Sequence, residues 1–277
     1  MKGEWEMRRR FAVAAAALAL SAALTVPAYA GTWKYVNDQW KYQRGTNKFA
    51  YNEWIKDNGK YYYIGNDGIM KTGWQQIDGQ WYYMDQTGVM QTGWFKSEDG
   101  KWYFLYPNGA MAVKTVIDGR TIGEDGVWVP NEGDTEPTNT MDLENGYLVQ
   151  NMEGITKNGY TIISSGKTSA GSRWGNAIRL KGKGSYVQCN TNGEYRLLSG
   201  GFGPSSQFDS ANMARITVYG DDNQVLYTSQ DIHYNEKNVY FGVDVSGQKQ
   251  IRVEVSLIKD NEWDDPVILF DGLSLYK

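Results

Sequence analysis

Aromatic residues recur at a fixed spacing in the first half of the chain. Trp54, Trp74 and Trp94 lie twenty residues apart, and each is followed seven or eight residues later by a second group of rings. Two or three π faces can enclose a quaternary ammonium group at about 0.5 to 2 kcal/mol per contact, and an indole face can also stack on a sugar ring. The alternative is that these rings only form a core, which we expect for those that face inward.

The rings belong to a repeated unit of about twenty residues between Trp54 and Met111. Each copy has a lead tryptophan, a polar turn, a second group of rings and a closing Gly-x-Met. The turn at residues 57–59 (Asp-Asn-Gly) is typical of a β-hairpin, because asparagine and glycine accept positive φ. A hairpin alone is marginal in water, so we expect the copies to stack into a solenoid. A more divergent copy of the repeat runs from Trp33 to Phe49. We interpret Thr115–Val129 as a degenerate repeat that caps the end of the array.

These units resemble the choline-binding (cell-wall-binding) repeats of Gram-positive surface proteins. The resemblance covers about Trp33 to Met111 and rests on Thr-Gly-Trp, the turn glycine, Trp-Tyr-Tyr and Gly-x-Met in register. Similar repeats occur in glucan-binding proteins and in the receptor-binding ends of large clostridial toxins, so choline and glucan both remain candidate ligands.

The resemblance implies a site between consecutive hairpins, with two rings from one repeat and one from the next. Strand alternation selects the third ring of each set. The expected choline-binding sets are Trp33 and Trp40 with Tyr63, Trp54 and Tyr61 with Tyr83, and Trp74 and Trp81 with Phe104. A fourth pair, Trp94 and Trp102, lacks a partner ring.

The composition argues against several functional classes. The chain has 277 residues, is 41% hydrophobic and carries a net charge of −4, without a basic stripe among the rings, which argues against nucleic-acid binding. His233 is the only histidine and Cys189 the only cysteine. The chain therefore has almost none of the residues that zinc sites or Ser-His and Cys-His catalysis require. We expect no metal, no cofactor, a surface-exposed or half-buried His233 and an inert buried Cys189.

The N-terminus has the pattern of a secretory signal. Three arginines precede the apolar run Phe11–Val26, and residues 28–30 (Ala-Tyr-Ala) form a cleavage pattern. The run is shorter than the about 18 to 20 residues of a spanning helix, and no later stretch is apolar enough to cross a bilayer. No Leu-Pro-x-Thr-Gly signal is present, so we expect non-covalent surface attachment. The expected division is a signal peptide at 1–30, repeats at 31–129, a linker at 130–140 and a second domain at 141–277.

The second half has longer alternating stretches and fewer tryptophans. Alternation of apolar and polar residues predicts strands, and no amphipathic helix is evident, which favours an antiparallel β-sandwich and an all-β chain. The expected strands are Ala214–Tyr219, Val225–Thr228, Val239–Val245, Gln250–Leu257 and Val267–Tyr276.

This half resembles the NPCBM family of carbohydrate-binding modules, whose fold is a galactose-binding-like jelly roll. The matching stretches are residues 200–230, 243–256 and 267–277, and residues 270–272 (Phe-Asp-Gly) stand where the family often has Trp-x-Asp. Related sandwiches bind ligands at loops on one end, and tryptophan can stack on a sugar while arginine and aspartate bond its hydroxyls. The candidate sugar contacts are Arg173, Trp174, Trp263 and Asp264, although both tryptophans could instead be packing residues. The acids Asp260, Glu262, Asp264 and Asp265 could hold calcium, but we expect a solvated loop.

Three functions are consistent with these patterns. The one we expect is a secreted, non-enzymatic protein at the cell wall of a Gram-positive bacterium. Its repeats would attach to choline-substituted teichoic or lipoteichoic acid or another wall glycan, and its sandwich would bind or present a glycan. A wall hydrolase or glycosidase would need two carboxyl groups about 5 to 9.5 Å apart in a cleft, and no sequence motif indicates such a pair. A surface adhesin whose sandwich binds a protein partner is the third reading.

Overall fold

The computed structural model describes residues 31–139, 141–143, 145–152, 156–169, 173–208, 210, 212–259 and 267–277. The signal-peptide prediction for residues 1–30 lies outside this part of the chain. The chain forms two compact units, Met1–Gln91 and Thr92–Lys277, and each is described by itself. The described residues form strands and two short 3-10 helices, η1 (Val149–Asn151) and η2 (Asp221–Asn223), so the all-β prediction is confirmed. None of their helices is long and apolar enough to cross a membrane.

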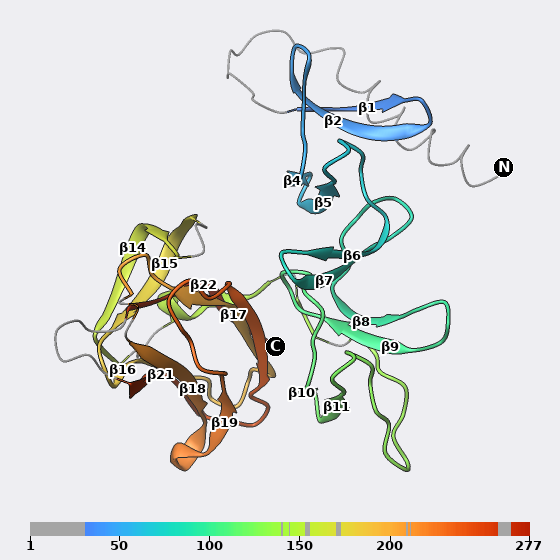
Figure 1. Ribbon diagram of the computed structural model, residues 1–277. Helices are drawn as coiled ribbons and strands as arrows, with labels where there is room; N and C mark the ends of the chain where they lie inside the picture. Colours follow the sequence, from blue (N-terminus) through green and yellow to red (C-terminus); the bar gives the residue numbers. More distant parts are fainter. Residues whose placement is uncertain are drawn as a thin grey trace, which may run out of the picture. The chain divides into compact units, whose positions relative to one another are not determined.

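The first unit consists of β-hairpins, as the repeat predicts (Figure 1). The strands are β1 (Thr32–Val36) paired with β2 (Gln39–Gly45), β3 (Lys48–Phe49) added to β2, β4 (Glu53–Asp57) paired with β5 (Lys60–Ile64), and β6 (Gly73–Ile77) paired with β7 (Gln80–Met84). In the β4–β5 turn, φ is 49° at Asn58 and 79° at Gly59. Positive φ at both positions gives the turn twist that matches the paired strands, so the predicted hairpin turn is confirmed.

Consecutive hairpins of this unit are joined by a backbone hydrogen bond at the same place in each repeat. The N–H of Met70 donates to the carbonyl oxygen of Trp40, and the N–H of Met90 donates to that of Tyr61, both at 2.8 Å. The methionine of each Gly-x-Met therefore docks on the preceding hairpin. This stacking is consistent with the expected solenoid.

The glycine of Gly-x-Met is required where a methionine from the preceding repeat lies against it. Gly88 has a φ of +83°, and a Cβ added there would lie 2.4 Å from Sδ of Met70. A side chain at this position would meet both backbone strain and a steric clash.

The Gly88→Ala variant is expected to lower the free energy of unfolding of the first unit by about 2 kcal/mol. About half of this comes from the left-handed backbone and the rest from displacing Met70. Gly59→Ala is the matched control, because Gly59 also has positive φ (+79°) but has no atom within 4 Å of an added Cβ. Urea unfolding followed by tryptophan fluorescence measures both. Equal losses in the two variants would show that the Met70 contact contributes nothing.

The second unit begins with two further hairpins. They are β8 (Gly93–Lys96) with β9 (Trp102–Leu105), and β10 (Thr115–Ile117) with β11 (Arg120–Ile122). The segment interpreted as a terminal cap thus folds as a hairpin. The N–H of Trp128 donates to the carbonyl oxygen of Trp102 at 2.8 Å, and a Cβ added to Gly126 would lie 2.5 Å from Cε of Met111. Residues 126–128 therefore repeat the Gly-x-Met contacts, with tryptophan in place of methionine.

The rest of the second unit is a β-sandwich of two facing antiparallel sheets, as predicted (Figure 1). One sheet has the order β14-β15-β22-β17-β20, with β12 paired to β22; the other has the order β13-β16-β21-β18-β19. The bounds are β12 (Tyr147–Leu148), β13 (Thr156–Asn158), β14 (Tyr160–Lys167), β15 (Arg173–Lys181), β16 (Ser185–Asn190), β17 (Leu197–Pro204), β18 (Met213–Tyr219), β19 (Val225–Thr228), β20 (Val239–Asp244), β21 (Gln250–Lys259) and β22 (Val267–Tyr276). The strands predicted in the second half correspond to β18 through β22.

The core of the sandwich is formed by alternating apolar residues of both sheets. Phe202 lies 5.5 Å from Phe241 and 6.2 Å from Phe270, ring centroid to ring centroid, and these three side chains belong to one sheet. Cys189 of the facing sheet is buried, and this burial raises the pKa of its thiol to about 12. The predicted burial of this thiol is thus confirmed, and the raised pKa disfavours the reactive thiolate. His233 is exposed.

The hairpins of the second unit pack against the β20 edge of the sandwich. Tyr106, just after β9, is only 4% exposed, and a Cβ added to Gly242 of β20 would lie 2.2 Å from its ring. The N–H of Gly119 donates to Oδ2 of Asp244 at 2.9 Å, and Asp118 forms an ion pair with Arg196. The hairpins and the sandwich are therefore joined by the Tyr106 ring, which packs on Gly242, and by polar contacts at the β10–β11 turn.

Candidate functional site

The pairing register determines which rings of a hairpin share a face. In the β4–β5 hairpin, Trp54 is opposite Tyr63 and Lys56 is opposite Tyr61, so these four side chains lie on one face. Tyr62 points to the other face. The β6–β7 hairpin has the same register, with Trp74 opposite Tyr83 and Trp81 opposite Gln76; its other face carries Tyr82.

The lead tryptophan of each hairpin in the first unit meets the middle ring of the next hairpin. Trp33 lies 4.9 Å from Tyr62, and Trp54 lies 4.9 Å from Tyr82, both edge to face. The sequence prediction had placed the third rings, Tyr63 and Tyr83, in these positions.

The third rings instead lie against the tryptophan of their own hairpin. Tyr63 is 5.1 Å from Trp54, and its hydroxyl donates to Oδ1 of Asn52 at 2.7 Å. Tyr83 is 5.3 Å from Trp74. The reason is geometric: alternation places the first and third rings on one face, and the next hairpin contacts the preceding one through its opposite face.

The first ring after the turn is exposed in two of the three hairpins of the first unit. Tyr61 is 39% exposed and Trp81 is 41% exposed, while Trp40 is half-buried against Tyr35 at 5.0 Å. Trp74 and Trp81 lie 6.4 Å apart with an angle of 84° between their planes, so two π faces stand at right angles. We name two sets: the Trp33 cluster (Trp33, Trp40 and Tyr62) and the Trp54 cluster (Trp54, Tyr61 and Tyr82).

A carboxylate lies beside the Trp33 cluster. The indole Nε1–H of Trp33 donates to Oδ2 of Asp57 at 3.1 Å, which holds the ring across two hairpins. Burial raises the pKa of the Tyr62 hydroxyl, and the negative charges of Asp57 and Asp85 raise it further. The structure adds negative potential, which favours a cationic ligand.

A cation of the chain itself lies at the Trp54 cluster. The Nζ of Lys56 is 5.1 Å from the centroid of Tyr61. The corresponding residue is Tyr35 in the β1–β2 hairpin and Gln76 in the β6–β7 hairpin. Lysine here therefore distinguishes the Trp54 cluster from its neighbours.

The members of the third predicted set belong to different units. Trp74 and Trp81 are in the first unit. Phe104 is in the second, where it is buried 5.2 Å from Trp94 and 5.9 Å from Tyr106. This set stays a prediction.

The pair without a partner ring, Trp94 and Trp102, has contacts with the predicted linker. The N–H of Trp94 donates to Oδ1 of Asn139 at 2.6 Å, and Nδ2 of Asn139 donates to the carbonyl oxygen of Trp94 at 3.0 Å. Lys96 lies 5.4 Å from the Trp102 ring and forms an ion pair with Glu136. Trp94 is buried.

The predicted sugar contacts of the sandwich are only partly within the described residues. Arg173 and Trp174 start β15, where they pair with Lys167 and Gly166 of β14. Their side chains are not among the described parts of the structure, and neither are Trp263, Asp264 and the neighbouring acids. Phe270, at the position of the family tryptophan, is buried in the core, where it cannot stack on a ligand. Within the described residues, no three histidine, cysteine, aspartate or glutamate side chains are grouped to hold a metal ion.

Comparisons with known proteins match both halves of the chain. A family model for a choline-binding repeat matches residues 71–115, and one for a cell wall binding repeat matches residues 52–70. A model for the NPCBM/NEW2 domain matches residues 168–271. No curated protein matches the sequence.

Solved structures similar to parts of the chain fall into the same two groups. Choline binding protein F from Streptococcus pneumoniae, in the presence of a peptidoglycan analogue, is 41% identical over 35% of this chain and 33% of its own (TM-score 0.33). The choline binding domain of Spr1274 in Streptococcus pneumoniae is 42% identical over 28% of this chain and 93% of its own (TM-score 0.27). CBM51 from Clostridium perfringens GH95, in complex with methyl-galactose, is 12% identical over 47% of this chain and 99% of its own (TM-score 0.38).

The chain spans about a third of the length of choline binding protein F. The family matches lie on the two halves where the repeated rings and the sandwich were found. The chain therefore carries choline-binding and cell wall binding repeats, followed by an NPCBM/NEW2 carbohydrate-binding domain.

Proposed function

We propose that this is a secreted, non-enzymatic protein of a Gram-positive cell surface that attaches non-covalently to choline-bearing teichoic or lipoteichoic acid. The repeats at 31–129 make the attachment, and the sandwich at 141–277 binds or presents a glycan. A signal peptide at 1–30 directs export, and residues 130–140 link the modules. The matches to choline-binding repeats and to a carbohydrate-binding domain support this assignment.

The observation that carries the proposal is the ring arrangement of the Trp33 and Trp54 clusters. Each brings a tryptophan of one hairpin to 4.9 Å from a tyrosine of the next, with the rings edge to face. A trimethylammonium group that contacts rings from both hairpins gains about 0.5 to 2 kcal/mol per ring. Because teichoic acid is a polymer, several weak sites on one chain reinforce each other through effective concentration. In this proposal the third rings of the two sites are Tyr62 and Tyr82, which contact the lead tryptophans, in place of Tyr63 and Tyr83.

A choline resin tests the attachment. The protein is expected to be retained on immobilised choline, and free choline is expected to elute it while an equal concentration of sodium chloride does not. Passage through the column without delay would contradict the proposal. Incubation with peptidoglycan and with aryl glycosides is expected to give no products, and measurable turnover would overturn the non-enzymatic assignment.

The Lys56→Gln variant is expected to bind choline more tightly. The Lys56 ammonium lies over Tyr61, where it occupies a π face and repels a second cation. Two cations about 4 Å apart in water repel by about 1 kcal/mol, so the affinity of the Trp54 cluster should rise about fivefold. The measurement is a choline titration followed by tryptophan fluorescence.

Lys48→Gln is the matched control, because it removes the same charge from the exposed strand β3. Its choline affinity should equal that of the wild type. If Lys56→Gln also leaves the affinity unchanged, Lys56 does not hinder choline binding.

A further inference from the structure

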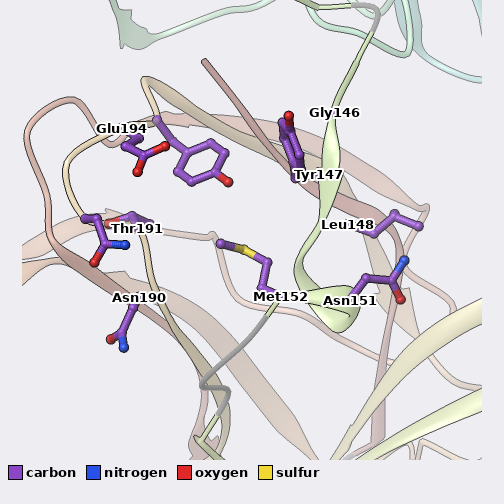
Figure 2. A pocket seen from close by; sticks show the side chains of 10 residues that line it. Gly146, Tyr147, Leu148, Asn151, Met152, Asn190, Thr191 and Glu194 are labelled. Carbon is purple, nitrogen blue, oxygen red and sulfur yellow. The ribbon is translucent and has the colours of Figure 1, made fainter.

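The sandwich has a cavity of about 650 Å³ that no sequence pattern indicated (Figure 2). Two segments form its walls. One is the stretch through β12 and η1, which contributes Tyr147, Leu148, Asn151 and Met152. The other is the end of β16 with the connection to β17, which contributes residues 190–192, 194 and 195. Figure 2 shows Tyr147 and Leu148 on one side and Asn190, Thr191 and Glu194 on the other. The volume is in the range that holds small ligands.

One wall of this cavity is aromatic and held in place. Tyr147 is 50% exposed, and its ring lies 5.7 Å from that of buried Tyr195 at an angle of 75°. The Nζ of Lys277 is 5.6 Å from the Tyr147 centroid and 5.3 Å from the Tyr195 centroid. An exposed ring fixed by two neighbours presents a preorganised stacking surface.

The described lining of the cavity is mostly polar, and its one charged side chain is paired. The side chains of Asn151, Asn190 and Asn192 offer amide donors and acceptors along the lining. Among the described residues of the lining, Glu194 is the only charged one, and its Oε2 lies 2.6 Å from Nζ of Lys277. Because this charge is already paired, the lining suits a neutral ligand with many hydroxyl groups better than an anion or a cation.

We propose that this cavity binds a neutral sugar ring, which stacks on Tyr147 while Asn151, Asn192 and Glu194 bond its hydroxyls. This assignment rests on the proposed function of the sandwich as a glycan-binding module, and it names where the glycan binds.

The cavity is at the C-terminal end of β22. β12 pairs with Ser274 and Leu275, at the C-terminal end of that strand. Trp263 and Asp264 precede its N-terminal end at Val267. Thr168, directly after β14, is near that end, because it bridges Ser205, whose N–H donates to the carbonyl oxygen of Val267 at 2.9 Å. Val267 and Ser274 are seven residues apart on β22, which is about 23 Å along a strand, so the cavity is distinct from the N-terminal end of that strand.

Ligand-observed NMR with the full chain tests the site. The probes are the methyl glycosides of galactose, glucose, mannose, N-acetylglucosamine and N-acetylgalactosamine. We expect at least one to bind, Tyr147→Ala to weaken it about tenfold or more, and Tyr147→Phe to retain it, since stacking needs the ring and not the hydroxyl. Tyr234→Ala is the matched control, because Tyr234 is similarly exposed (40%) but on the β19–β20 connection, and it should bind as the wild type does.

The other outcomes separate this proposal from the proposed function. If a glycoside binds equally to the wild type and to Tyr147→Ala but is lost in Trp174→Ala or Trp263→Ala, the cavity is not the site, although the sandwich remains a glycan-binding module. If no glycoside binds while the protein is still retained on choline resin, the cavity proposal is overturned and attachment through the repeats stands. An unchanged melting temperature of Tyr147→Ala shows that any loss of binding is not unfolding.

Discussion

A variant with both Trp33 and Trp54 replaced by alanine is expected to pass through a choline resin that retains the wild-type protein. Each substitution removes the tryptophan face of one ring cluster, which lies 4.9 Å from Tyr62 or Tyr82 of the next hairpin. The loss is about 1 to 2 kcal/mol per cluster. Two such losses amount to about 30- to 1,000-fold in affinity, and they also reduce the multivalency on which retention depends.

The control for this result is the double variant Trp33→Phe, Trp54→Phe. Phenylalanine keeps an aromatic face and much of the packing volume, although it loses the Nε1–H bond from Trp33 to Asp57. Its retention should lie between those of the wild type and the alanine variant. Circular dichroism checks that both variants are folded. A folded alanine variant that is retained as strongly as the wild type would show that these tryptophans are only core residues.

The Tyr106→Ala variant is expected to lower the free energy of unfolding of the second unit by about 3 to 5 kcal/mol. The Tyr106 ring is almost fully buried, lies 5.9 Å from Phe104 and covers Gly242 of the sandwich. Removing a buried aromatic ring loses its transfer free energy and leaves a cavity that closes only in part. Urea unfolding measures the loss, and Tyr234→Ala, which changes an exposed tyrosine, should stay within about 0.5 kcal/mol of the wild type. A small loss at Tyr106 would mean that the hairpins contribute little to the stability of the sandwich.

The same burial gives Tyr106 a pH signature. Burial raises the pKa of its hydroxyl well above the usual value of about 10, because the charged phenolate is poorly solvated there. The folded state therefore favours the protonated form, so this stabilisation is complete below about pH 10 and declines as the pH rises above it. Tyr106→Phe, which cannot ionise, should lose less stability than the wild type between pH 10 and 12.

The repeat was predictable because its signals are local. Asn-Gly or Asp-Gly at a turn specifies a hairpin through the φ values that those residues tolerate, and Asn58 and Asp78 have φ of 49° and 52°. The stretches that became β18 to β22 were predictable for the same reason, since alternation with period two marks a half-buried strand. The degenerate segment Thr115–Val129 was harder to interpret, because Trp128 stands where the other copies have methionine.

The partner rings were not predictable, because they depend on how one hairpin lies on the next. Alternation correctly put the first and third rings on one face, but it does not say which face meets the preceding hairpin. The contacts of Trp33 with Tyr62 and with Asp57 connect residues more than twenty positions apart, and no local spacing encodes them.

The sequence by itself determined the hairpin unit, the number of residues per copy, the all-β class and the two kinds of binding module. The tertiary structure alone decided that Tyr62 and Tyr82 complete the ring clusters, that Tyr106 packs on Gly242, and that Tyr147 and Glu194 line one cavity. The physical reason is that turn chemistry and strand period act between near neighbours, whereas these contacts arise only when separate strands pack together.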